Sequence, residues 1–433
     1  MEPITNKTEM KKRGLALYFT LPIISWALYD AANTIFSSNI NTIFFPLYLQ
    51  DMVGSNEVTK QIASTFITYA NALASFLLVI FTPLFGVMMD RTGKKKKYIV
   101  ILTLLTVFGT IAMGFFSFIP STQQIFGIPI SLALVILFFV LSKFTYHSSL
   151  VFYDTMISDL GTKEQIPLIS GFGVAIGYIG TLIGLTVYLF IDEGAYNQSF
   201  IPTGILFLLL SLPLFFFIKD TPKENIQKQS VLSGYREIIE TFKQMKSYRK
   251  IFTFMLAYFF LNDALATTIA TMSAYANAVI GLDTGKFIVL YLVSTIASII
   301  GSFVFGYITK SVGAYRAVRY VGILLVIAII IATLAKNEGL FWVAGSLFGV
   351  ALGSMWVTTR TYIVEITPEE KRGQFFGLFA FSGKVSSIIG PLIYGTITLV
   401  FAEYGNIASR FALSSLIILT IIGLVIHARI KED

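Results

Sequence analysis

The chain has 433 residues, of which 55% are hydrophobic and 13% charged, and its mean hydropathy is +0.76. Soluble domains carry roughly 25% charged residues, so this chain has too few charges to cover a water-exposed surface and is predicted to lie in a bilayer. The sequence has no cysteine and two histidines, which excludes disulfides, cysteine nucleophiles and Cys- or His-based metal sites, so we expect no metal and no other cofactor.

Twelve apolar segments are long enough to cross a bilayer, since a spanning helix needs roughly 20 mostly apolar residues. They lie near residues 17–49, 62–89, 98–118, 128–156, 167–190, 200–218, 251–279, 286–309, 317–335, 339–364, 373–400 and 408–428. With both termini in the cytoplasm, the inner segments hold 25 Lys and Arg residues, the outer loops 4 and the spans 3. This asymmetry predicts an all-α, multi-pass protein of the cell membrane with cytoplasmic N and C termini. The net charge of +8 is then explained by the membrane surface, and nucleic acid is not expected as a partner.

The first predicted helix carries a polar stripe. Asp30, Asn33, Ser37 and Asn41 are spaced so that they share one helical face. Such a stripe either lines water or makes hydrogen bonds between helices. A central aspartate costs on the order of 2.5–3.5 kcal/mol in a membrane helix. We therefore expect Asp30 to act in transport, whereas Ser37 and Asn41 fit hydrogen bonds within the bundle.

A glycine-rich, charged loop joins the second and third helices. Gly86 permits close helix contact, and Gly93 permits a tight turn. Asp90, followed by Arg91, could accept hydrogen bonds from the N-terminus of a neighbouring helix and complement its positive dipole. The loop is therefore predicted to be a conformational latch. The lysines at 94–97 also anchor the loop to the cytoplasmic face.

The fourth helix places Lys143, His147 and Asp154 on one face. His147 has the ordinary charge change of histidine near neutral pH, so it could relay protons. It could equally be a hydrogen-bonded packing residue.

The middle segment, 219–250, carries eight Lys and Arg residues. Apolar residues recur there at helical spacing, and they are Leu232, Tyr235, Ile238, Ile239, Phe242 and Met245. This pattern predicts an amphipathic helix on the cytoplasmic face, and the alternative is a mostly disordered linker.

Glycines repeat between the two halves of the chain. One pair recurs at an offset of 220, as Gly86 and Gly93 against Gly306 and Gly313. Three more recur at an offset of 206, as Gly171, Gly177 and Gly184 against Gly377, Gly383 and Gly390. Parallel repeats of this kind build transporters with a site between the halves. We therefore predict a six-helix bundle over 1–218, a linker over 219–250 and a second bundle over 251–433.

The second half has its own intramembrane charges. Asn262 and Asp263 lie in the seventh helix, which corresponds to the first, and Asp263 shares a face with Thr267 and Thr271. Asp263 could bind a cationic group, a proton or Na⁺, or it could form an ion pair with a buried Lys or Arg.

Arg360 in the tenth helix and Lys384 in the eleventh are the basic residues within the spans of this half. Arg360 corresponds to Asp154 at the offset of 206. The two cations could hold a substrate carboxylate, or they could neutralise Asp30, Asp154 or Asp263.

The loop that contains Asp90 resembles the G-x-x-x-D-R-x-G-[RK]-[RK] motif of the major facilitator superfamily, and all its fixed positions are met at 86–95. In the second half, Lys310 stands where the Asp would be. The resemblance implies two six-helix bundles that move a solute by alternating access.

Within that superfamily, the chain is similar to the vacuole effluxer-like branch, which is related to autophagy-linked vacuolar amino-acid exporters. Trp26, Tyr29, Asp30 and Asn33 match its W-x-L-Y-D-x-A-N pattern, and Asn262-Asp263 match its N-D pattern. The resemblance implies that these residues bind substrate or ion. Asp154 departs from the Asn expected there, so the choice of substrate or coupling ion could differ.

The resemblance implies efflux of amino acids or related metabolites. We also expect coupling to protons or Na⁺ through Asp30 or Asp263, a monomer, and no enzymatic activity. Two alternatives stay open: a cation-coupled sugar symporter, and a transporter-like sensor or partner protein that moves nothing.

Overall fold

The computed structural model describes residues 14–53, 57–119, 123–125, 128–192, 194–220, 231–244 and 246–430. This part of the chain is almost entirely helical, and one short antiparallel pairing joins β1 (Gln124–Ile125) to β2 (Ile128–Pro129). The chain divides into two compact units, which comprise 1–156 with 176–228, and 157–175 with 229–433. The boundaries of the predicted bundles therefore stay a prediction.

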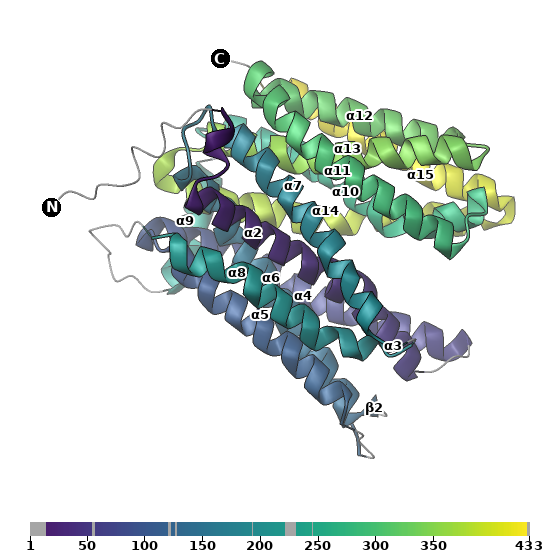
Figure 1. Ribbon diagram of the computed structural model, residues 1–433. Helices are drawn as coiled ribbons and strands as arrows, with labels where there is room; N and C mark the ends of the chain where they lie inside the picture. Colours follow the sequence, from purple (N-terminus) through teal and green to yellow (C-terminus); the bar gives the residue numbers. More distant parts are fainter. Residues whose placement is uncertain are drawn as a thin grey trace. The chain divides into compact units, whose positions relative to one another are not determined.

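The first unit is built from long apolar helices. They are α2 (Leu21–Phe36), α3 (Phe45–Val53), α4 (Glu57–Thr92), α5 (Lys95–Ser117), α6 (Ile130–Met156), the second half of α7 (Ile166–Leu185) and α8 (Phe200–Phe217). Short helical turns accompany them at η1 (Gly14–Leu17), η4 (Thr186–Phe190) and η5 (Tyr196–Ser199). In Figure 1, α5 runs alongside α6 and α8, and α2 also contacts α8.

The second unit begins with η3 (Ile157–Asp159) and the first half of α7. The rest follows in chain order as α9 (Val231–Lys243), α10 (Arg249–Tyr275), α11 (Thr284–Val312), α12 (Ala314–Leu334), α13 (Glu338–Ile366), α14 (Arg372–Val400) and α15 (Asn406–Ala428), with the turns η7 (Glu369–Lys371) and η8 (Ala402–Tyr404). In Figure 1, α13 runs alongside α11 and α12, while α10 contacts α14 and α15.

Within the described residues, eleven helices are long and apolar enough to cross a membrane. The first predicted span is not among these eleven. Residues 21–53 are nonetheless continuously helical, because α2 is followed directly by η2 (Ser37–Phe44) and α3. Because the π-helical η2 interrupts the run, α2 itself has only 16 residues and is too short to cross a membrane alone.

A π-helical segment follows the first helix of each half. In the first half it is η2, and in the second it is η6 (Ala276–Ile280), which follows α10. π-Helical segments are rare in proteins, and those that occur often lie at functional sites. Their recurrence after α2 and α10 extends the likeness of the halves from glycines to backbone form.

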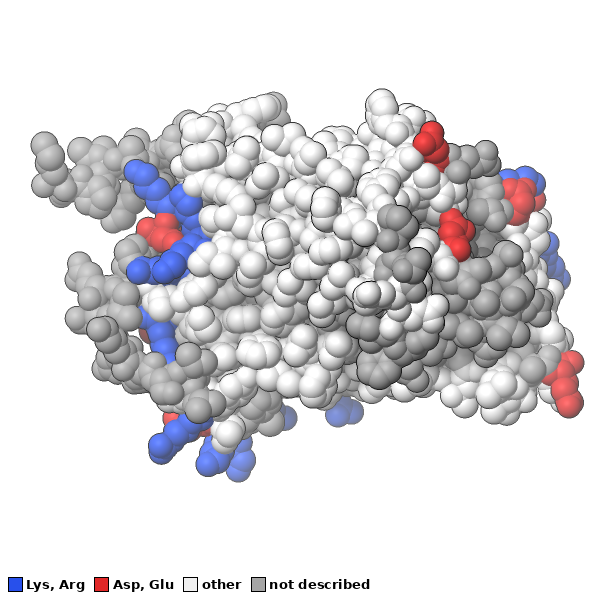
Figure 2. Space-filling view, turned by 90° about the horizontal axis from the view of Figure 1, so that it is seen from below, with Lys and Arg blue, Asp and Glu red and all other residues white. Residues whose placement is uncertain are grey.

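Apolar side chains cover the outer faces of the helices. Phe108 on α5 is 59% exposed and Leu392 on α14 is 63% exposed, which water would penalise and lipid does not. On the face drawn in Figure 2, most of the visible Lys and Arg residues lie toward the left edge, and the middle of the surface is largely uncharged. The protein is therefore a multi-pass membrane protein.

The helix predicted within 219–250 is present as α9. Ile238 and Thr241 are buried, whereas Ile239 is exposed. The Gln374 side chain at the start of α14 donates to the Glu237 carbonyl oxygen at 3.2 Å and to Thr241 Oγ1 at 2.8 Å. These bonds dock α9 on α14. Residues 221–230, Met245 and the basic residues at 7–13 lie outside the described residues.

Candidate functional site

Aromatic and hydroxyl contacts fix the middle of α2 in the first unit. The Trp26 and Tyr153 rings stack with centroids 4.8 Å apart. Each ring also donates a hydrogen bond to the backbone carbonyl of the other residue, at 3.3 and 3.2 Å. The Tyr29 hydroxyl lies 2.6 Å from Thr103 Oγ1 and donates to Ser149 Oγ at 3.1 Å. Tyr29 therefore holds α2 against α5 and α6.

Asp30 and Asn33 are buried on another face of α2, at 8% and 2% exposure. Asp30 lies beside Gly177 of α7, where an added Cβ would come within 3.2 Å of the Asp30 Cγ. Neither the nitrogen nor the oxygen of the Asn33 amide has a hydrogen-bond partner among the described residues. Buried polar groups without partners are uncommon, so Asn33 marks a place where a ligand or water would be bound.

Three glycines of α7 allow α2 to approach closely. The Thr34 hydroxyl donates to the Gly177 carbonyl oxygen, and Asn39 Nδ2 donates to the Gly184 carbonyl oxygen at 2.8 Å. A Cβ on Gly180 would lie 2.5 Å from the Ala31 Cα. Thr34 and Asn39 were not predicted as site residues. The signal in the sequence is the combination of a polar side chain on one helix with glycines that recur every three to four residues on another, and this combination could have identified them.

The polar face of α6 lies in the same unit. Lys143 is half-buried with its ammonium 5.8 Å from the Phe139 ring centroid, and His147 has its ring 4.7 Å from that of Tyr146. The buried Tyr146 phenol interacts with the Ser37 side chain and lies within electrostatic range of Asp30 and Asp154. The structure therefore brings the predicted residues of α2 and α6 into one polar region of the first unit.

In the second unit, α10 and α14 form the matching contact. Asn262 Nδ2 donates to the Gly383 carbonyl oxygen at 3.0 Å and to Ser386 Oγ at 2.9 Å. The Gly390 backbone N–H donates to Asp263 Oδ1 at 2.8 Å. The predicted Asn262 and Asp263 thus both face the glycines of α14, and they bracket two turns of that helix.

Contacts with glycines show where each aspartate lies along its partner helix. Asp30 lies against Gly177, whose counterpart Gly383 lies against Tyr258, while Asp263 lies against Gly390, the counterpart of Gly184. The two aspartates were expected at corresponding places in their helices. Instead, Asp263 meets its glycine helix at Gly390, about two turns beyond Gly383, the counterpart of the glycine that Asp30 meets.

Arg360 and Lys384 take different environments within the second unit. Arg360 on α13 is 9% exposed and is surrounded in sequence by buried threonines. Lys384 on α14 is half-buried and follows Gly383. Their role toward a substrate carboxylate stays a prediction.

The predicted latch ends α4 in the first unit. Gly86 is buried, whereas Asp90, Arg91 and Gly93 are half-buried. Gly93 has a φ of 68°, and Gly313 has a φ of 86° at the corresponding turn between α11 and α12. Both turns therefore need glycine. The latch function stays a prediction.

Sequence reasoning missed Asp220, which follows α8. Its carboxylate accepts hydrogen bonds from the backbone N–H groups of Lys96 at 2.7 Å and Lys97 at 3.1 Å, both in the first turn of α5. Lysines at a helix N-terminus oppose the helix dipole, and a carboxylate there compensates it. The four lysines at 94–97 ahead of an apolar helix signal the need for such a carboxylate.

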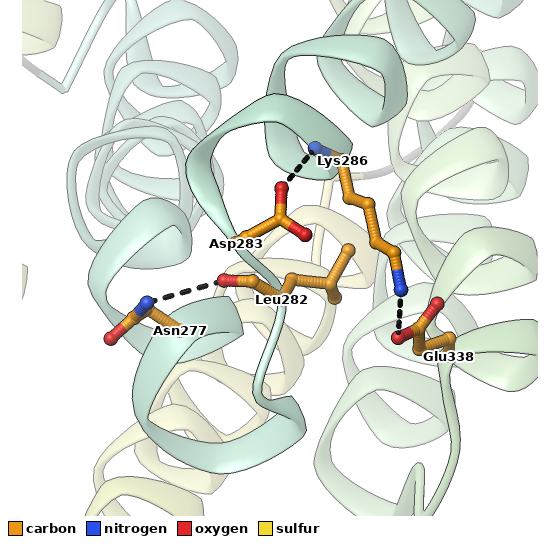
Figure 3. A network of polar contacts seen from close by, with 5 residues as sticks. All are labelled: Asn277, Leu282, Asp283, Lys286 and Glu338. Atoms are coloured by element: carbon orange, nitrogen blue, oxygen red, sulfur yellow. Dashed lines mark hydrogen bonds and ion pairs between the residues drawn. The ribbon is translucent and has the colours of Figure 1, made fainter.

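A separate polar network in the second unit joins the connection between α10 and α11 to the connection between α12 and α13 (Figure 3). The Asp283 side chain caps α11 by accepting from the Lys286 backbone N–H at 2.8 Å, and the Lys286 ammonium pairs with Glu338 at 2.7 Å. Asn277 donates to the Leu282 carbonyl oxygen at 3.2 Å. Both partners of the ion pair are exposed, so the network fixes loops and does not form a buried site.

Comparisons with known proteins agree that the chain is similar to membrane transporters. A family model described as vacuole effluxer Atg22 like matches residues 158–433. The uncharacterized MFS-type transporter YxiO of Bacillus subtilis is 27% identical over 428 residues, covering 96% of each chain. Autophagy-related protein 22 of Kluyveromyces lactis is 24% identical over 274 residues, covering 55% of each chain.

Solved structures of major facilitator proteins share the fold. A bacterial homologue of the iron transporter ferroportin in an outward-facing state has a TM-score of 0.71 at 13% identity, covering 94% of this chain and 98% of that one. The transporter FucP in an outward conformation has a TM-score of 0.70 at 13% identity, covering 96% and 100%. At such identities the likeness concerns the fold and carries no substrate.

Proposed function

Because the chain belongs to the Atg22-like vacuole effluxer family and has the fold of major facilitator transporters, we propose that it exports amino acids or related zwitterionic metabolites by alternating access. It is a membrane transporter of this superfamily. The proposal adds twelve spanning helices with the run 21–53 as the first, cytoplasmic termini, a location in the cytoplasmic membrane and a monomeric state.

The buried Asn33 amide is the observation that carries the proposal. Its nitrogen and oxygen have no hydrogen-bond partner among the described residues, and it lies one turn from Asp30 on α2. An amide can donate and accept at once, and Asp30 adds a negative charge. Together they suit an ammonium group and its neighbouring polar atoms.

A zwitterion also needs a positive group for its carboxylate. Arg360 lies within α13 and Lys384 within α14, and a guanidinium can bind a carboxylate through two parallel hydrogen bonds. In the first unit, Lys143 on α6 is a further cation in a polar region that includes Asp154. Each unit thus carries a carboxyl group and at least one cation within its helices, which favours amino acids over neutral sugars.

Exchange in liposomes tests the substrate class. Purified protein is reconstituted in liposomes loaded with an unlabelled amino-acid mixture or with unlabelled sugars, and labelled tracer of the same class is added outside. We expect tracer accumulation with amino acids. Accumulation with sugars alone would reject the amino-acid assignment, and no exchange with either class would favour a protein that moves nothing.

Asn33→Ala tests the site itself. It should reduce exchange about tenfold, because a hydrogen bond to a charged group contributes about 1.5–3 kcal/mol. Thr42→Ala is a matched control on the same helical run, since the Thr42 hydroxyl donates only to the Ser37 carbonyl oxygen at 3.0 Å and faces outward. Equal exchange by both variants would remove Asn33 from the site.

A further inference from the structure

Asp263 is an aspartate buried in the middle of a membrane helix. Its side chain is fully buried on α10, at 0% exposure. One carboxyl oxygen, Oδ1, accepts the Gly390 backbone N–H at 2.8 Å. The other, Oδ2, has no hydrogen-bond partner among the described residues.

No cation compensates this carboxyl group in the described part of the chain. The groups that face it are the Thr267 side chain on α10 and the Gly390 backbone on α14. On the neighbouring side, α15 places Gly423 against Leu261 and the Ala257 carbonyl oxygen. An ionised carboxylate without a paired cation is unfavourable in so apolar a place, so burial favours either a bound proton or a bound cation.

The surroundings of Asp263 favour the proton. The Thr267 hydroxyl faces the Asp263 carboxyl group and makes no other hydrogen bond among the described residues. Both it and Asp263 Oδ1 lie where a Cβ on Gly390 would be, with Oδ1 2.6 Å from that point. These few oxygens can share one proton. A hard metal cation prefers six or more oxygen ligands, which the contacts of this carboxyl group do not supply.

A series of hydroxyl groups continues from this site along α10. Thr271 lies one turn beyond Thr267 and donates to the Thr267 carbonyl oxygen at 2.8 Å. The buried Tyr394 phenol on α14 interacts with the Thr271 side chain. The hydroxyls of Thr267, Thr271 and Tyr394 therefore mark a polar route from Asp263 toward the end of α10 that leads into η6.

The first half lacks this arrangement at the corresponding level. Asn39 lies against Gly184, as Thr267 lies against Gly390, and the Asn39 amide nitrogen donates to the Gly184 carbonyl oxygen and to Thr203 Oγ1. Ile35, which also lies against Gly184, takes the place of Asp263. The same helix contact is therefore apolar and hydrogen-bonded in one half, and carries a titratable group in the other.

We propose that Asp263 is the proton-binding site that couples transport, with Thr267 as its hydrogen-bond partner and the α10–α14 contact as the element that responds. The coupling role rests on the proposed transport function. A proton from water binds Oδ2 and returns to water when the site opens. The ionised carboxylate accepts the Gly390 N–H more strongly than the protonated acid does.

The structural response to protonation of Asp263 would be confined to α14. Pro391 follows Gly390 and has no N–H, so it cannot donate to the Ser387 carbonyl oxygen one turn earlier. A proline at this position makes the helix easy to bend. Protonation of Asp263 therefore changes the contact at the point where α14 yields most readily.

Infrared titration of the reconstituted protein tests the site without any transported solute. The difference between wild type and Asp263→Asn should show the carbonyl stretch of one protonated carboxylic acid at neutral pH, replaced by carboxylate bands as the pH rises. Asn keeps an oxygen that can accept the Gly390 N–H, so the variant should still fold.

Two further variants give the matched comparison. Thr267→Val should shift the midpoint of this titration by about one pH unit, since one hydrogen bond contributes about that much. Thr268→Val should leave it unchanged, because the Thr268 hydroxyl donates to the Ala264 carbonyl oxygen of its own helix at 2.8 Å. Equal midpoints for both variants would remove Thr267 from the proton site.

Ionised Asp263 at neutral pH would overturn the proposal. If, in addition, NaCl but not choline chloride raised the melting temperature of wild type and not of Asp263→Asn, the site would be a sodium site. Failure of exchange with every solute would defeat the proposed function and leave a titrating Asp263 in place. Proton-independent exchange by wild type would defeat the coupling role alone.

Discussion

The two glycine-lined helix pairs, α2 with α7 and α10 with α14, have the same design and are fastened differently. In the first, Thr34 and Asn39 donate to glycine carbonyl oxygens of α7. In the second, Asn262 donates to Gly383, while Asp263 accepts from the Gly390 backbone. At the Gly184 level the first pair is thus closed by neutral hydrogen bonds, whereas at the corresponding Gly390 level the second pair holds a titratable group.

Spacing between the helices differs as well. Gly180 of α7 lies so close to α2 that a Cβ would come 2.5 Å from the Ala31 Cα. At the offset of 206 its counterpart is Ser386, whose side chain fits and accepts a hydrogen bond from Asn262. At this position the first pair is therefore packed more tightly than the second, in which a serine side chain fits between the helices.

Gly180→Ser should have the largest effect on this comparison. The new side chain would meet backbone atoms of α2, which cannot move aside, and overpacking of this kind costs about 1–3 kcal/mol or more. We expect a lower melting temperature and a broadened size-exclusion peak. The reciprocal change, Ser386→Gly, should cost much less, and equal losses in both variants would contradict the difference in spacing.

Asn39→Leu should come next. It leaves the Gly184 carbonyl oxygen and Thr203 hydroxyl without their donor, which costs about 1–3 kcal/mol in a buried site. Thr267→Val, at the corresponding place in the second half, removes a hydroxyl that faces only the Asp263 carboxyl group, so it should cost less stability than Asn39→Leu. Thermal unfolding measures the loss of stability in both variants. A larger loss in Thr267→Val than in Asn39→Leu would contradict this assignment of the hydrogen bonds.

Asp220→Ala should reduce stability by about 0.5–2 kcal/mol, the usual loss when a helix cap is removed. The expected effect is at the upper end because four lysines surround the start of α5. Asp220→Asn should recover part of it, since an amide oxygen still accepts from one backbone N–H. Melting temperatures at low and high salt test this, and no recovery by Asn would point to charge alone.

The smallest effect is expected for Lys286→Gln. The ion pair with Glu338 has side chains 51% and 44% exposed, and such pairs contribute about 0–1 kcal/mol. Its loss should lower the melting temperature slightly and only at low salt. A large loss would mean that the connections in Figure 3 carry more of the second unit's stability than exposure suggests.

Much of this molecule could be predicted because its solvent imposes strict rules. Segments of about 20 apolar residues must be helical in a bilayer, so their placement follows from composition. The Gly93 turn was predicted from residue type, and its φ of 68° confirms it. Family membership was also predicted, from motifs at Asp30, Asp90 and Asp263, and the family model and the relatives confirm it.

Other features depended on partners that are distant in sequence. The stripe on α2 identified Asn33 but not that its amide has no hydrogen-bond partner among the described residues, because that depends on which side chains of other helices come near it. Asp220 caps a helix that begins more than 120 residues earlier, so no local pattern shows the contact.

The sequence by itself determined the solvent, the helical character of the chain, the repeated glycine spacing and the identity of the intramembrane charges, because each follows from composition or short-range spacing. Only the tertiary structure decided which glycine each of those charges meets. Within its own unit Asp30 lies against Gly177, whereas Asp263 lies against Gly390, whose counterpart in the first half is Gly184. Helical spacing fixes which side chains share a face, whereas the close approach of one particular glycine fixes the register of two helices, and that register separates the neutral contact at Gly184 from the buried acid at Gly390.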